Sequence, residues 1–365
     1  MERISQILDN LTKIKSPSGK ENQMGEYLQS AYKKYVDRIV IDNRGNVFFH
    51  KDALHSKNCK NVMILAHMDT IGVMVTHVEE NGYLRIDKIG GINNSVLLGK
   101  KIEFVKENQI IPGIVGCIPP HVKGNDNISN DMSELWVDIG ARNKEEALKI
   151  ISIGDYGIIS SEPTLLSNNM IGMGALDNKS SLCVMLSVIE KLSNIKFDKL
   201  NLSFVASTQE EIGLRGSSAI GHAHSPDIVI VLDVTHSTDF PGMKKAIYGD
   251  IKLGEGPVIP ISPDTTEEIQ NKLKSVASEI GIDYQIQAFS HPIGTDTNSL
   301  HKDNIKTKIG LLCIPCRYMH SSYEVVSLID ISGTYQLLIK TISDLNSVVL
   351  DEPSIHHPIG AIHEE

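Results

Sequence analysis

The 365-residue sequence has little of what several classes of protein need. It contains five cysteines and one tryptophan, and aromatic residues make up 5% of it. Five scattered cysteines do not supply the disulfide framework of a small secreted protein. No uninterrupted apolar stretch reaches the ~18 residues that span a bilayer, and the N-terminal segment lacks the apolar core of a signal peptide. We therefore expect a cytoplasmic protein with no membrane partner.

Positive charge is also scarce. The 45 acidic residues outnumber the 35 basic ones, which leaves a formal net charge of -10. Such an excess of acidic residues disfavours binding to nucleic acid or to anionic membranes. The apolar fraction of 41% is enough for a normal hydrophobic core, and the length allows two domains. The composition therefore indicates an enzyme or a binding protein that has no nucleic-acid partner.

Alternating strand and helix patterns predict an α/β domain that a second unit interrupts. The run NVMILAH (61–67) is typical of a strand buried on both faces. From residue 73 to about 163 the chain breaks into short β-like pieces, and strand and helix patterns alternate again from Met173. We predict a three-layer α/β/α domain from residues 1–69 and 165–350, a small β-rich domain at 70–164, and a poorly ordered tail at 351–365.

Ionisable residues follow the apolar runs of this α/β domain. They are Glu210 and Glu211 after NLSFVAS, His67 and Asp69 after NVMILA, Asp233 after DIVIVL, His320 after GLLCIPCRYM, and Asp177 before a helix. Each alone is explained by a cap or a turn, but the carboxyl ends of parallel strands meet at one edge of a sheet. Buried together, these groups need a counter-ion. Histidine with carboxylate favours zinc, cobalt or manganese over magnesium or calcium.

Two other features compete as metal ligands. Cys313 and Cys316 form a C-x-x-C pair, which without a second pair is weak evidence for zinc, so we interpret both as packed thiols. His236 follows Asp233 by three residues and is an alternative ligand at that position. The residues by themselves do not decide between His236 and Asp233.

Seven motifs, taken in order, resemble those of a known family. They are SPSGKE, AHMDTIGVMV, MGALDNKSS, ASTQEEIGLRG, VLDVTHSTDFPG, IGTDTNSL and CRYMHSSYEVV. Together they are similar to the motifs of the glutamyl and tetrahedral aminopeptidases, which are dinuclear metallopeptidases whose members sometimes carry endoglucanase labels. The likeness runs from about residue 4 to residue 345. It implies a metallopeptidase domain with an inserted PDZ-like domain.

The resemblance implies two divalent metal ions per subunit, with zinc or cobalt favoured and manganese a further candidate. It makes Asp177 the bridge between the ions. His67 and Asp233 would complete one site, and Glu211 and His320 the other. Three protein ligands per ion leave positions open for water and substrate.

The resemblance also implies a reaction and an assembly. Glu210 would be the general base and acid, a metal-bridged water the nucleophile, and Asp69 the residue that orients His67. The substrates would be peptides that lose their N-terminal residues. The insert would make homo-oligomer contacts, in many relatives towards a tetrahedral dodecamer.

Alternatives remain at this point. A dinuclear metallo-deacylase or carboxypeptidase-like hydrolase uses the same ligand types, although its extra domain occurs later in the chain than the insert does here. A non-catalytic assembly protein could retain the fold, yet all seven expected positions are filled. A glycosidase would leave the histidines unexplained, and no G-x-S-x-G motif supports a serine hydrolase.

Overall fold

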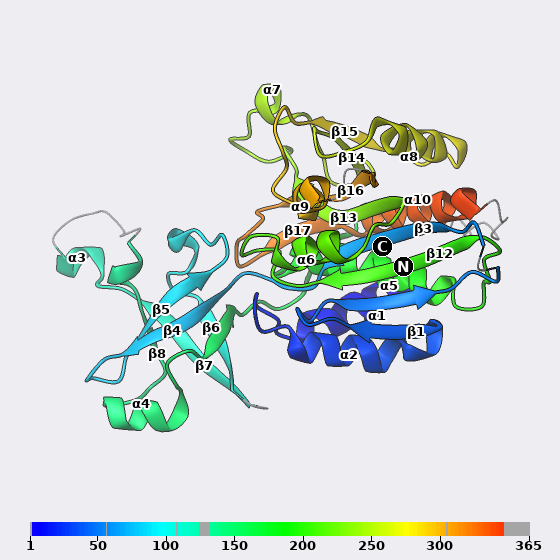
Figure 1. The fold of residues 1–365 in the computed structure, drawn as a ribbon. Helices are drawn as coiled ribbons and strands as arrows, with labels where there is room; N and C mark the ends of the chain where they lie inside the picture. Colours follow the sequence, from blue (N-terminus) through cyan, green and yellow to red (C-terminus); the bar gives the residue numbers. More distant parts are fainter. Residues whose placement is uncertain (1, 56, 107–108, 124–130, 304–305, 347–365) are drawn as a thin grey trace, which may run out of the picture.

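A computed structural model describes residues 2–55, 57–106, 109–123, 131–303 and 306–346. The chain forms a large mixed sheet with helices on it and a separate small barrel, which projects from one end of the large domain (Figure 1). The tail predicted at 351–365 lies outside the described residues. In the part of the chain that is described, no helix is long and apolar enough to cross a membrane.

Among the described residues the large sheet has eleven strands, and its centre is parallel. The order is β1-β2-β12-β3-β13-β16-β17-β11-β10, with β14 and β15 continuing from β16. The four central strands β12, β3, β13 and β16 run parallel to one another. The strands are β1 (Arg38–Ile41), β2 (Val47–Lys51), β3 (Lys60–His67), β10 (Thr164–Leu166), β11 (Met170–Met173), β12 (Leu200–Ser207), β13 (Ile228–His236), β14 (Val258–Ile261), β15 (Gln285–Ala288), β16 (Lys308–Arg317) and β17 (Glu324–Ser327).

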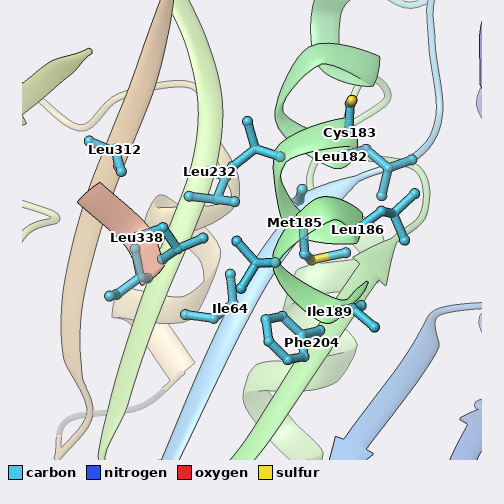
Figure 2. Close-up of a cluster of buried hydrophobic side chains, with 14 of the residues drawn as sticks. Ile64, Leu182, Cys183, Met185, Leu186, Ile189, Phe204, Leu232, Leu312 and Leu338 are labelled. Atoms are coloured by element: carbon cyan, nitrogen blue, oxygen red, sulfur yellow. The ribbon is translucent and has the colours of Figure 1, made fainter. Parts of the chain in front are cut away.

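Helices cover both faces of this sheet, as the three-layer prediction requires. One core joins the sheet to α1 (Glu2–Lys13), α2 (Asn22–Tyr32), α5 (Leu176–Lys191), α8 (Glu267–Glu279) and α10 (Leu328–Asn346). Figure 2 shows Met185 and Ile189 of α5 beside Phe204 of β12. The other face packs against α6 (Arg215–Ala223) and α9 (Asp296–Asp303), and α7 (Lys245–Tyr248) lies on a connecting loop.

The inserted segment closes into a barrel with its own core. Its strand order is β4-β5-β8-β7-β6-β9, with β9 returning to β4. The elements are β4 (Gly72–Val78), β5 (Leu84–Ile89), β6 (Lys101–Lys106), β7 (Gln109–Gly116), α3 (Pro120–Lys123), β8 (Trp136–Asp138), α4 (Lys144–Ile150) and β9 (Tyr156–Ile159). The predicted fold class, an α/β domain with a small β-rich insert, is confirmed.

The barrel contacts the first segment of the large domain closely. Lys15 Nζ lies 3.1 Å from a carboxylate oxygen of Glu103 on β6. A Cβ at Gly72 would lie 2.8 Å from both the Gly157 carbonyl oxygen and Pro17 Cβ, so glycine is the residue that fits this crossing. β10 then rejoins the large sheet through its pairing with β11. The limits of the insert at 70–164 stay a prediction.

Candidate metal centre

The register of the parallel strands brings His67 and Asp233 together. Leu65 of β3 pairs with Val231 of β13, so the residues two positions further on lie side by side on the same face. β3 ends at His67, whereas β13 continues for three residues beyond Asp233. Asp233 therefore lies inside its strand and not at the strand end that the sequence suggested.

Asp177 lies between two histidines and offers one carboxylate oxygen to each. Its Oδ1 is 3.2 Å from Nε2 of His67, and its Oδ2 is 3.3 Å from Nε2 of His320. The segment takes a non-helical backbone at Asp177 and Asn178 before α5 continues regularly, and the peptide bond between these two residues is cis. The carboxylate thus faces two separate groups of potential ligands.

The first group, which we call the inner cluster, consists of His67, Asp177 and Asp233. All three are buried. Nε2 of His67 lies 3.7 Å from Oδ1 of Asp233, and one ligand atom from each residue lies within 4.8 Å of the others. Imidazole nitrogen with two carboxylates, at these separations, is a donor set that suits a divalent transition metal.

The second group, the outer cluster, consists of Asp177, Glu211 and His320. Nε2 of His320 lies 3.3 Å from a carboxylate oxygen of Glu211, and the His320 side chain is 34% exposed. His320 has a positive φ of 61° in the turn between β16 and β17. The two clusters share Asp177, so together they offer two adjoining groups of potential metal ligands.

A turn after β12 presents Glu210 and Glu211 to the two clusters. The Asp69 carboxylate accepts hydrogen bonds from the backbone N–H groups of Glu210 at 3.1 Å and Glu211 at 3.2 Å. It also accepts the hydroxyl hydrogen of Ser18. Glu210 itself lies within 4.0 Å of Nε2 of His67 and is 9% exposed. The Asp69 carboxylate therefore fixes the backbone of the turn that carries the two glutamates.

Asp69 approaches His67 with both its backbone carbonyl and its carboxylate. The Asp69 backbone carbonyl oxygen is 3.2 Å from Nδ1 of His67, whereas the nearer carboxylate oxygen is 3.5 Å away. The carbonyl oxygen can only accept, so it favours the ring form in which Nδ1 carries the hydrogen and Nε2 points to the cluster. The backbone carbonyl is thus the nearer of the two Asp69 contacts to the imidazole, and the Asp69 side chain accepts the N–H groups of the glutamate turn.

Three supporting residues were not assigned any role from the sequence. Glu21 accepts backbone N–H groups of Gly19 and of Gln209, the latter with a positive φ of 54°. Asp296 accepts the hydroxyl hydrogens of Ser207 and Ser217. Glu21 lies in the motif SPSGKE and Asp296 in IGTDTNSL, and a carboxylate within such a motif was the available signal.

Glu324 is the third of these residues, and it links the two halves of the outer cluster. Its carboxylate accepts the backbone N–H of Asp177 at 2.8 Å and that of His320 at 2.9 Å. The residue is 2% exposed, and burial raises its pKa to about 8. The signal for Glu324 in the sequence was a charged residue at the start of the apolar strand EVVS.

Burial raises the pKa of three carboxyl groups in or beside the clusters. It raises the pKa of Asp233 to about 8, against the opposing charge of His67. It holds the pKa values of Glu210 and Glu211 well above the usual range, and the charge of Asp177 adds to the effect on Glu211. Burial also acts on Asp177, but hydrogen bonds from His320 and His67 outweigh it and lower the Asp177 pKa.

The two histidines are affected in the opposite direction. Burial alone would lower the pKa of His320, but the Asp177 hydrogen bond and the charge of Glu211 raise it to about 10. The pKa of His67 is likewise raised, by the charge of Glu210 and by Asp177, against burial. Without a metal, protons on these rings offset the carboxylate charge. A divalent cation would take over that function.

One buried atom supports this fit directly. Oε1 of Glu211 is buried and has no hydrogen-bond partner among the described residues. Such an atom is costly to bury unless a cation or water completes its contacts. The donor set and this orphaned oxygen therefore fit a metal site.

The competing ligands do not join the clusters. Cys313 and Cys316 are both buried on β16, but they pack into the cores on opposite faces of the sheet, as a separation of three residues requires. They cannot share one metal ion from those positions. Among the described residues, the two groups with metal-binding geometry contain neither thiol, and they contain Asp233 and not His236.

A three-layer α/β domain with a barrel insert and paired His/carboxylate clusters at its sheet edge defines a metallopeptidase-like hydrolase. Residues 45–337 match the model of the M42 glutamyl aminopeptidase family, and the chain belongs to this family. It is therefore a peptide hydrolase, and peptidases of this family are metallopeptidases. The resemblance read from the seven motifs is confirmed.

Relatives of known name support this assignment. The chain is 34% identical over 309 residues to the lysyl aminopeptidase of Pyrococcus furiosus, covering 84% of this chain and 86% of that protein. It matches an aminopeptidase structure from Desulfurococcus kamchatkensis with a TM-score of 0.87 and 32% identity, covering 94% and 95% of the two chains. It also matches the Pyrococcus horikoshii TET1 peptidase, which can assemble into a tetrahedron or a large octahedral shell, with a TM-score of 0.82, 27% identity and coverage of 92% and 98%.

Proposed function

We propose that this protein is an aminopeptidase that uses two divalent metal ions to release N-terminal residues from peptides. The observation that carries the proposal is the position of the Asp177 carboxylate. One of its oxygens faces His67 and the other faces His320. The inner cluster would hold one ion and the outer cluster the other, with Asp177 shared. Zinc or cobalt suits this mixture of nitrogen and oxygen donors, and manganese is a further candidate.

Glu210 is the residue that we propose moves the proton. Divalent ions in the two clusters would polarise the scissile carbonyl and lower the pKa of a water molecule. Glu210 lies beside the clusters without belonging to either, and burial holds its pKa well above the usual range of a carboxyl group. It accepts the proton of the attacking water and donates it to the leaving amine.

The Glu210→Gln variant tests this division of labour. The amide is nearly isosteric but cannot accept the proton, so we expect kcat to fall by about 10²–10⁴-fold while both ions remain bound. Turnover of a leucine or lysine p-nitroanilide and elemental analysis of the same preparation measure the two quantities. A variant that loses its metal, or one that keeps wild-type turnover, contradicts the assignment.

The direction of cleavage needs its own experiment, because it rests on the family. We propose that substrates have a free N-terminus. A peptide library digested by the cobalt- or zinc-loaded enzyme should yield single N-terminal residues and spare N-acetylated peptides. Release of acyl groups or of C-terminal residues would favour the deacylase or carboxypeptidase alternative, and loss of all hydrolysis would favour an assembly protein. Sugar release from carboxymethyl cellulose without peptide cleavage would also overturn the proposal.

We further propose that the barrel carries homo-oligomer contacts in a cytoplasmic assembly. Apolar side chains are exposed along β7 and the segment after it: Ile110 at 56%, Ile114 at 51%, Ile118 at 50% and Val122 at 68%. Exposed apolar patches of this kind are typical of interaction surfaces. The Ile110→Asp/Ile114→Asp variant should sediment as a smaller species than wild type, and sedimentation at the wild-type mass would contradict this placement.

A further inference from the structure

In each cluster a backbone carbonyl oxygen lies within hydrogen-bond distance of Nδ1 of the histidine, but the two carbonyls come from different parts of the chain. Behind His67, the carbonyl acceptor for Nδ1 belongs to Asp69, two residues further along the chain. Behind His320, the acceptor is the carbonyl of Gly91, which lies 3.1 Å from Nδ1 and 229 residues away in the sequence. Gly91 follows β5 and belongs to the barrel insert.

We propose that the barrel insert is a positioning element of the outer metal site, acting through the Gly91 carbonyl. This inference rests on the proposed function, because it concerns the ion bound by Asp177, Glu211 and His320. A carbonyl oxygen accepts and cannot donate, so Nδ1 of His320 carries the hydrogen in this contact. Nε2 is then the ring nitrogen left to bind an ion, and it faces Asp177 and Glu211 at 3.3 Å each.

The space around Gly91 shows how closely the barrel approaches the histidine. A Cβ at this position would lie 2.8 Å from Nδ1 of His320 and 3.1 Å from Cε1. Gly90, with a φ of 80°, approaches the other outer ligand, since a Cβ there would lie 3.4 Å from Cβ of Glu211. The two glycines therefore place barrel backbone against Glu211 and His320, the two ligands that belong to the outer cluster alone.

The loop that carries Gly91 is anchored in the barrel. Ile92 is 3% exposed and belongs to the barrel core. The Asn93 side chain accepts the backbone N–H of Ser95, which fixes the turn that follows. The barrel core therefore anchors the loop that carries this carbonyl. A partner carbonyl behind a ligand histidine fixes the ring orientation, and its loss typically costs about 10–100-fold in metal affinity or activity.

The test is a cobalt titration of metal-free full-length protein, followed by visible absorption and calorimetry. Gly91→Ala places a methyl group against the His320 ring, and we expect it to weaken one of the two ions about 10–100-fold and to leave the other unchanged. Peptide hydrolysis by the variant should recover towards the wild-type kcat as cobalt is raised. A folded Gly91→Ala protein that binds both ions with wild-type affinity overturns the inference.

A second pair of variants keeps the test decisive if Gly91→Ala does not fold. Asn93→Ala removes the cap of the turn next to Gly91, and Asn143→Ala removes the equivalent cap of α4 elsewhere in the barrel. Selective weakening of one ion by Asn93→Ala, with Asn143→Ala like wild type, supports the inference. Equal affinities in both variants, or equal losses in both, overturn it. A wild-type protein that binds no cobalt and cleaves no peptide overturns the proposed function, and this inference with it.

Discussion

The inner and outer clusters use the same types of ligand but differ in what surrounds them. His67 is 2% exposed and its supporting carbonyl lies two residues away, whereas the His320 side chain is 34% exposed and its support comes from another domain. Asp177 belongs to both. The difference teaches that His67 and Asp233, two of the three inner ligands, come from neighbouring parallel strands of the large sheet. The outer histidine, in contrast, contacts a carbonyl of the barrel, on which we propose that the outer site depends.

The largest effect is expected from the residue that the two clusters share. Asp177→Asn replaces the bridging carboxylate with a neutral amide, so both ions should be lost. Hydrolysis should then fall by more than the roughly 10²–10⁴-fold expected for loss of the general base. Elemental analysis after desalting measures the metal content. If one ion stayed bound at the wild-type level, Asp177 would serve a single cluster and the comparison above would fail.

A smaller and more selective effect is expected from residues that belong to one cluster each. A chelator should remove the ion of the exposed outer cluster before that of the buried inner cluster. Glu211→Gln should shift the EDTA concentration at which the outer ion is removed, and Asp233→Asn should shift that for the inner ion. Each shift should exceed the roughly 10–100-fold change typical of a lost supporting partner. Graded EDTA titration of cobalt-loaded protein separates the two steps.

Cys316→Ala is the matched control for this pair, because Cys316 is buried close by on β16 but lies in neither cluster. It should leave both steps where they are in the wild type. A single step in every variant would show that the two clusters are not distinguishable.

The smallest effect is expected from pH on the metal-free protein. A carboxyl group whose pKa is raised on folding keeps a proton that the unfolded chain has released, so it lowers stability as pH rises between the two values. Asp233 and Glu324, each raised to about 8, act in this direction up to pH 8. His320, raised from 6.5 to about 10, contributes stability that is complete below pH 6.5 and is lost as pH rises through 10.

Both effects have the same sign above neutrality. We therefore expect the Tm of metal-free protein to fall by several degrees between pH 6.5 and 9, while bound metal flattens this dependence. Asp177 and Asp69, whose pKa values are lowered against the effect of burial, act at acid pH and not in this window. Calorimetry with and without cobalt measures the difference, and parallel curves would contradict the proposed proton–metal exchange.

The sequence predicted the inner cluster for a reason that the register makes clear. Ligands that follow apolar parallel strands meet at one edge, and the periodicity of the strands sets which face they share. The sequence did not predict roles for Glu21, Glu324 and Gly91, because their contacts join segments far apart in the chain. Glu324 reaches back to Asp177 across 147 residues, and Gly91 meets His320 across 229. Such contacts depend on tertiary packing, which no local pattern encodes. The roles of all seven predicted site residues stay predictions, as do the domain limits and the cytoplasmic location.

The position of β3 in the sheet has a consequence for how the protein is synthesised. Its two neighbours are β12 and β13, and the first of them begins at Leu200, 133 residues after His67 (200 minus 67). At about 5–20 residues per second, roughly 7–27 s pass before either neighbour is made. The barrel strands, which end at Ile159, are complete within that interval.

During this wait the apolar strand VMILA has both edges unpaired, which is the condition that promotes aggregation. We expect ribosome-stalled chains of increasing length to protect the barrel from protease while residues 60–67 stay open to cleavage. Protection of β3 in chains that end before Leu200 would show that it finds temporary cover elsewhere.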